Sequence, residues 1–90
     1  MEIERVLEIR NSLGLHARAA ARVVELGKSF NSRLYLRKND LEVDADGVLS
    51  ILSLSCPRGT RIRARIVGDD AVRFMEALER LFENRFGENQ

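Results

Sequence analysis

The segment Arg61–Ile66 alternates strictly between arginine and apolar residues, and it constrains the fold of this chain more than any other feature. It reads Arg-Ile-Arg-Ala-Arg-Ile. Successive side chains of a β-strand point to opposite faces of the sheet. The alternation therefore predicts a strand with one face in the core and the other in water. A sheet built on such a strand is covered on one side only.

Three other segments show the same period-two pattern of apolar residues. They predict strands over Ile3–Arg10, Arg33–Arg37 and Leu41–Asp44. The pair Asn39–Asp40 suits a tight hairpin turn between the last two of these strands.

Three further segments repeat apolar residues at helical spacing instead. They predict helices over His16 to about Lys28, through Val48–Leu52, and from Asp70 to about Phe86. We expect Asp44 or Asp46 to cap the short helix, because a carboxylate can accept from free first-turn amides. The last helix has Asp69 or Asp70 available for the same purpose.

The element order is then β-α-β-β-α-β-α. Because the strands alternate and each helix has one apolar face, we expect an α+β fold of the open-faced sandwich type. Its four-stranded antiparallel sheet carries all three helices on one face. We expect residues 1–90 to make a single domain of this kind.

The composition excludes several function classes. Fifteen Lys and Arg against fourteen Asp and Glu leave a formal net charge of +1, which predicts no general attraction to nucleic acid or membranes. No segment approaches the roughly 18 apolar residues of a spanning helix. With one cysteine, Cys56, and one histidine, neither a disulfide nor a structural metal site is expected, and no cofactor is indicated. We interpret the chain as a cytoplasmic monomer, and we assign Cys56 no role beyond packing.

The segment Asn11–Arg18, between the first strand and the first helix, is the best candidate for chemistry. His16 is placed to cap the helix, where free amides and the helix dipole favour an anion. Arg18 can offer paired donors to phosphate oxygens, and Gly14 permits a sharp entry into the helix. Spacing alone does not distinguish this arrangement from a histidine that only caps a helix beside a solvated arginine.

The run Gly14-Leu15-His16-Ala17-Arg18-Ala19-Ala20 resembles the signature Gly-Leu-His-Ala-Arg-Pro-Ala of the HPr family, the histidine phosphocarriers of bacterial phosphotransferase systems. The resemblance extends over nearly the whole chain, including the element order. It implies that His16 receives a phosphoryl group on Nδ1 from enzyme I and donates it to an EIIA-type protein. It also implies that Arg18, Gly14 and the amide of Ala17 form the phosphate site.

Two positions depart from the family pattern. Ala19 replaces the proline of the signature, which adds an amide and removes no reactive group. Gly47 stands where kinase-regulated members carry a serine, so the regulatory serine is absent. The sequence from Leu34-Tyr35-Leu36-Arg37 onward and the Phe82–Gly87 tail resemble the nitrogen-regulatory branch, NPr, which leaves a nitrogen-regulatory phosphorelay as an alternative.

A carrier must present a docking surface around its histidine, apolar at its centre and basic at its edge. The candidates are Val48, Leu49, Leu52, Arg22 and Lys28. Some apolar residues of a helix this short must face the core, and Leu49 is the one we expect to be exposed.

Two rival interpretations remain. The arginines of Arg61–Ile66, with Arg33, Tyr35 and Arg37, suggest a basic sheet face for RNA. Against this, Glu4 and Glu8 are expected to pair with those arginines, and one tyrosine is a poor stacking platform. The second rival, a regulator that binds partners without carrying phosphate, is disfavoured by the presence of His16.

Overall fold

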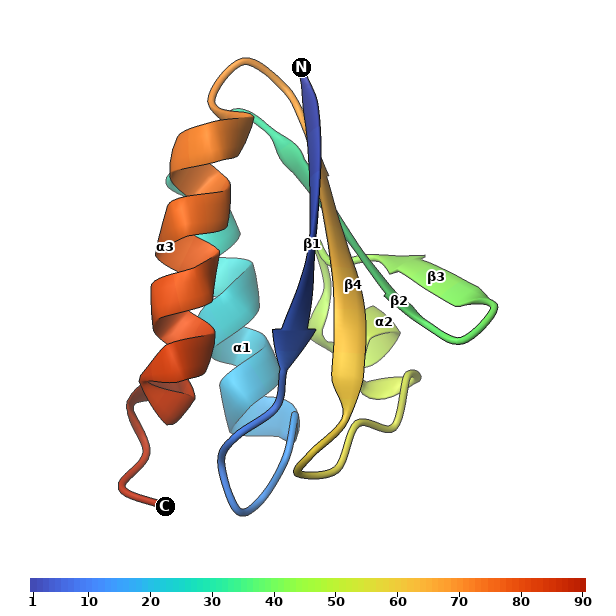
Figure 1. Cartoon of the computed structure of the whole chain (residues 1–90), viewed down its shortest axis with the longest axis vertical. Helices are drawn as coiled ribbons and strands as arrows, with labels where there is room; N and C mark the ends of the chain where they lie inside the picture. The colour runs from blue at the N-terminus through green and yellow to red at the C-terminus, as the bar shows by residue number, and fades with distance from the viewer.

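The computed structural model describes all residues from Met1 to Gln90 and has the expected β-α-β-β-α-β-α order, followed by one short 3-10 turn (Figure 1). The elements are β1 (Glu2–Glu8), α1 (Ala17–Gly27), β2 (Arg33–Lys38), β3 (Leu41–Asp44), α2 (Val48–Leu52), β4 (Arg61–Val67), α3 (Ala71–Glu83) and η1 (Arg85–Gly87). None of the helices is long and apolar enough to cross a membrane.

The sheet is antiparallel throughout, with strand order β1-β4-β2-β3. The alternating strand β4 therefore lies inside the sheet, between β1 and β2. Its residues Ile62, Ala64 and Ile66 are at most 1% exposed, while Arg61 and Arg63 are exposed to solvent. This confirms the predicted division into a core face and a solvent face.

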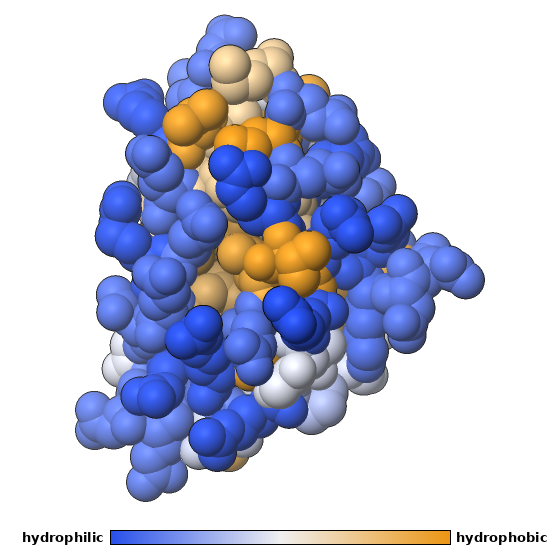
Figure 2. Space-filling view, in the orientation of Figure 1, coloured by the Kyte–Doolittle hydropathy of each residue, from blue (hydrophilic) through white to orange (hydrophobic).

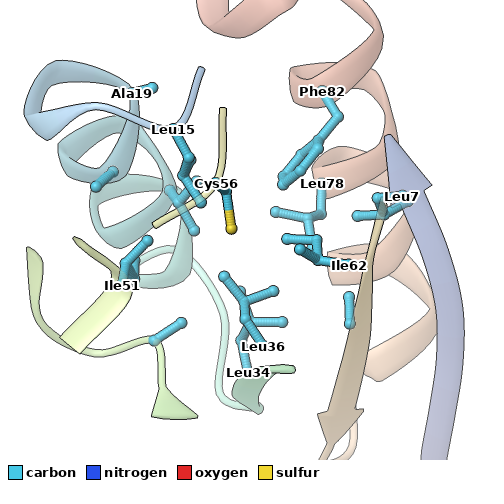
Figure 3. Close-up of a cluster of buried hydrophobic side chains, with 14 of the residues drawn as sticks. Leu7, Leu15, Ala19, Leu34, Leu36, Ile51, Cys56, Ile62, Leu78 and Phe82 are labelled. Carbon is cyan, nitrogen blue, oxygen red and sulfur yellow. The ribbon is translucent and has the colours of Figure 1, made fainter. Parts of the chain in front are cut away.

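The helices form a single layer on the apolar face of the sheet, where α1 and α3 pack against each other (Figure 1). Side chains from both layers meet in one core. Figure 3 shows Leu36 and Ile62 of the sheet directed toward Leu78 and Phe82 of α3. Cys56 lies in this core, and burial raises the pKa of its thiol. It is a packing residue, as expected.

The opposite face of the sheet is solvated, and Arg65 organises its charges. Its guanidinium lies 2.8 Å from a carboxylate oxygen of Glu42 and 3.4 Å from one of Glu2. It also covers the ring of Tyr35, 4.3 Å from the centroid. The expectation that Glu4 would pair with these arginines is wrong in detail: Glu4 lies opposite Arg65 in the register, but Glu2 and Glu42 make the ion pairs.

Glu8, the other carboxylate expected to pair with the arginines, lies opposite Arg61 in the register and makes no ion pair.

In the view of Figure 2 the surface is mostly hydrophilic, with small hydrophobic patches between charged residues.

Of the two expected carboxylate caps, that of α2 is wrong, whereas that of α3 is right in position but forms no side-chain capping bond. Gly47 is the N-cap of α2 and has no side chain to offer, whereas Asp44 accepts a hydrogen bond from the Asp46 amide at 3.1 Å. Asp70 is the N-cap of α3, as expected, but its carboxylate makes no hydrogen bond to the amides of that helix. It accepts from the Asn31 amide at 2.8 Å and from the Ser32 hydroxyl. Tertiary partners outcompete the local cap in this case.

Two elements are shorter at their C-terminal ends than predicted. β1 ends at Glu8 rather than Arg10, although the chain still pairs with the loop before β4 through the Ile9 amide and the Thr60 carbonyl (2.9 Å). α3 ends at Glu83, and Arg85 and Phe86 of η1 both have a left-handed backbone, with φ of 54° and 56°. A helix cannot continue through a residue in that conformation.

We expect Asp70→Asn to destabilise the fold in a pH-dependent way. The Ser32 hydroxyl and the Asn31 amide hold the pKa of Asp70 below its ordinary value of 3.8. A lowered pKa in the folded state contributes stability that is fully present above 3.8 and is lost as the pH falls through the folded-state value.

The difference in melting temperature between Asp70→Asn and the parent should therefore be largest near about pH 6 and should shrink below pH 3.8. Thermal unfolding followed by circular dichroism over this range measures it. Asp69→Asn, at an exposed neighbour without hydrogen bonds, is the matched control. A pH-independent difference for Asp70→Asn would contradict the assignment.

Candidate functional site

The loop that joins β1 to α1 is held tightly against the loop before β4. The Leu15 amide donates to the Cys56 carbonyl at 2.8 Å, and the Leu15 side chain is buried. Gly14 has φ of 71°, and a Cβ at this position would lie 2.5 Å from the Cys56 oxygen. Only glycine combines this backbone conformation with so close an approach.

His16 is the N-cap of α1, as the sequence predicts. Its backbone is extended, with φ of −80° and ψ of −179°, and its Nδ1 accepts a hydrogen bond from the Arg18 amide at 3.3 Å. The first intrahelical bond runs from the Ala20 amide to the His16 carbonyl (2.8 Å). The amides of the first turn before Ala20 are therefore directed out of the helix, next to the imidazole. The positive end of the helix dipole adds to this field.

Arg18 is exposed and makes no ion pair within the chain. Its side chain lines a shallow hollow together with Ser12, Leu13 and the C-terminal residues 88–90. His16, the Ala17 amide and Arg18 lie together at the start of α1, an arrangement that fits a small anion with several oxygen atoms. Gly14 shapes the loop instead of binding the anion, because it is buried and its amide donates to the Asn11 carbonyl at 3.1 Å. Ala19, in place of the signature proline, is fully buried.

The C-terminal tail completes this site, and our sequence analysis missed it. The Glu88 carboxylate lies 2.5 Å from His16 Nε2 and accepts from the Asn11 amide group at 2.8 Å. Burial of the carboxyl acts to raise its pKa, but these two hydrogen bonds and the nearby charges lower the pKa of Glu88 below its ordinary value. The Ser12 amide donates to the Gln90 carbonyl at 3.0 Å. No local pattern indicates a contact between residues this distant in the sequence; the one local signal is Gly87, because a glycine after an apolar stripe is typical of a helix end.

The predicted docking residues fall into two groups. Leu49 is 83% exposed, which confirms the expectation for this residue, whereas Val48 and Leu52 are half-buried. Arg22 lies one helical turn after Arg18, next to Gly87.

Lys28 does not join the other docking residues. It follows the C-terminal end of α1, about 16 Å along the helix axis from Ala17. Its nearest charged partner is Glu25, at 3.4 Å. The structure therefore does not bring Lys28 to the surface around His16.

Comparison with known proteins finds similarity to phosphocarrier proteins along nearly the whole chain. A family model described as "PTS HPr component phosphorylation site" matches residues 3–84. The chain belongs to the HPr family. A phosphocarrier protein HPr of Xylella fastidiosa is 42% identical over 87 residues, covering 97% of this chain and 98% of that protein. Phosphocarrier protein NPr of Escherichia coli is 31% identical over 90 residues, covering 99% and 100%.

Solved structures agree with the fold. The crystal structure of HPr from Thermoanaerobacter tengcongensis superposes with a TM-score of 0.92 at 35% identity, covering 98% of this chain and 99% of that one. The open-faced α+β sandwich is therefore confirmed. The chain is a phosphocarrier of the phosphotransferase system, a carrier rather than an enzyme that turns over substrate.

Gly14→Ala tests whether the close approach of Gly14 to the Cys56 carbonyl stabilises the loop before α1. The new methyl group would clash with the Cys56 carbonyl at a positive φ, so we expect a loss of about 2–4 kcal/mol in the free energy of unfolding. Urea denaturation measures the loss. Gly59→Ala separates the two causes, because Gly59 has φ of 90° but no atom within 4 Å of the added Cβ. Equal losses in the two variants would show that the contact with Cys56 contributes nothing.

Proposed function

We propose that His16 accepts a phosphoryl group on Nδ1 from phosphorylated enzyme I and donates it to an EIIA-type protein. The observation that carries this proposal is the position of Nδ1. It lies at the mouth of the first turn of α1, 3.3 Å from the Arg18 amide, with the Arg18 guanidinium free to turn toward it. The oxygens of a phosphoryl group bonded to Nδ1 through phosphorus would meet donors that already exist there.

The nucleophile needs no general base in this arrangement. Nδ1 accepts a hydrogen bond from the Arg18 amide, so it carries a lone pair and no proton. In the transfer, the bond between phosphorus and the donor group of enzyme I breaks as the phosphorus–Nδ1 bond forms. A phosphoryl oxygen then replaces Nδ1 as the acceptor for the Arg18 amide. Neutral imidazole suits this role because it is nucleophilic near physiological pH.

The docking surface for both partners lies around His16. Leu49 is 83% exposed and Leu13 is 71% exposed, so both offer apolar area that a partner can bury. Arg18 and Arg22 supply positive charge at one edge, which suits partners that carry phosphate. Lys28 is not part of the proposed docking surface, because it follows the end of α1 that is far from His16. Operation in the cytoplasm as a monomer stays a prediction.

A nitrogen-regulatory relay is the alternative within the same chemistry, since NPr of Escherichia coli aligns over 99% of this chain.

The interpretation of the sheet face as an RNA-binding surface loses support in the structure. Arg65 covers the ring of Tyr35 and pairs with two carboxylates, so the candidate stacking platform is occupied.

Incubation with enzyme I and phosphoenolpyruvate should label the parent chain with one acid-labile, alkali-stable phosphate. His16 is the only histidine, so any phosphohistidine reports this residue alone. His16→Asn should abolish the label while retaining a residue that caps helices well. Absence of label in the parent, or an equal label in His16→Asn, would sink the proposal.

Leu49→Asp should slow transfer from enzyme I about tenfold, because a charge replaces an apolar contact in the centre of the docking surface. The melting temperature should stay unchanged, since the side chain is 83% exposed. Leu41→Asp, at a half-exposed position in β3, is the matched control and should transfer at the parent rate. Stopped-time labelling of each variant measures the rates, and equal rates in both would move the docking surface elsewhere.

A further inference from the structure

The C-terminal tail is held against the phosphoryl site by its own anchors. Phe86 is fully buried, and its ring packs edge-on against Phe82 with centroids 4.8 Å apart. The Ser12 amide binds the Gln90 carbonyl at 3.0 Å. Glu88 therefore reaches the imidazole from a segment that is fixed on both sides.

Asn11 determines which oxygen of Glu88 faces the histidine. Its side chain is fully buried, and its amide group donates to the Gly14 carbonyl at 2.7 Å and to Glu88 Oε1 at 2.8 Å. The second oxygen, Oε2, is left for His16 Nε2 at 2.5 Å. Side-chain exposure at this contact is 26% for His16 and 15% for Glu88, so water competes weakly for it.

Both ring nitrogens of His16 therefore indicate the same tautomer. An ionised carboxylate can only accept, so Nε2 must carry the proton that it shares with Glu88. The Arg18 amide can only donate, so Nδ1 must be unprotonated. A partner on one ring nitrogen determines which form the other takes.

We propose that Glu88 is a positioning residue, which holds His16 in the Nε2–H tautomer and orients Nδ1 toward the incoming phosphoryl group. This role rests on the proposed transfer at His16. In that transfer Nε2 keeps its proton while Nδ1 forms the bond to phosphorus, so no proton has to leave the ring. The ring gains positive charge as the phosphorus–Nδ1 bond forms, and the Glu88 carboxylate offsets that charge.

Glu88→Gln tests the role with almost no change in shape. A carboxamide has one oxygen and one NH2 group, whereas two donors, from Asn11 and His16, face this side chain. If the NH2 faces His16, Nε2 has to accept and the proton moves to Nδ1, where it opposes the Arg18 amide. Glu88→Ala removes the partner altogether. Glu83→Gln, an exposed glutamate at the end of α3, is the matched control.

Nitrogen-15 shifts of the His16 ring, recorded on unphosphorylated protein at a pH where the ring is neutral, report the tautomer directly. The parent and Glu83→Gln should show protonated Nε2 and unprotonated Nδ1. In Glu88→Gln and Glu88→Ala the two shifts should move toward each other, and transfer from enzyme I should slow about tenfold, as for loss of a hydrogen bond to a charged group. Hydrogen exchange of the Ser12 amide checks that the tail stays docked.

Unchanged shifts and rates in both Glu88 variants would overturn the role of Glu88, and so would a parent protein that is protonated on Nδ1. The tautomer readout requires no phosphate. A parent that accepts no label refutes the transfer, while the shifts still decide separately whether Glu88 sets the tautomer.

Discussion

The one-sided burial of β4 is the constraint on which the rest of this structure depends. Its arginines occupy one face and Ile62, Ala64 and Ile66 the other, and its place between β1 and β2 extends this division over the sheet. Every helix must then pack on the same face. The chain that leaves β1 turns back over the core beside the loop before β4, where Cys56 accepts from the Leu15 amide. The helix terminus that presents His16 is thus a consequence of how the sheet is covered.

Periodicity alone predicted the fold, because each element has a strong pattern and neighbours that agree with it. It failed where short polar side chains had a choice of partner. Asp70 occupies a cap position and would suit the first turn of α3, but the Asn31 amide and the Ser32 hydroxyl compete for the same carboxylate. Sequence spacing carries no information on partners that only the tertiary fold brings near. The end of α3 was placed too late for a related reason. Phe86 is a buried apolar residue that fits the helical stripe, and the left-handed backbone of Arg85 and Phe86 leaves no mark on that pattern.

The candidate site likewise contains residues that the sequence predicts and one, Glu88, that it does not. His16, Arg18 and Gly14 are close in sequence, so helix geometry and the family signature were sufficient to bring them together. Glu88 could not be found like this, because its contact with His16 depends on the end of α3, on the buried Phe86 and on the orientation of Asn11. Lys28 shows the opposite error. It directly follows the helix that begins beside Arg18, but a helix of this length places it about 16 Å along the axis from Ala17.

His16 has two roles that compete for one nitrogen. As an N-cap it uses the Nδ1 lone pair to accept from the Arg18 amide, and as the proposed carrier it needs the same lone pair for phosphorus. The competition is mild, because the capping bond is long at 3.3 Å and a phosphoryl oxygen can take over as acceptor for the amide. The helix therefore keeps a capped terminus in both states, with the imidazole in one and the phosphoryl group in the other. Glu88 acts on the opposite nitrogen, so it can hold the ring through the exchange without blocking it.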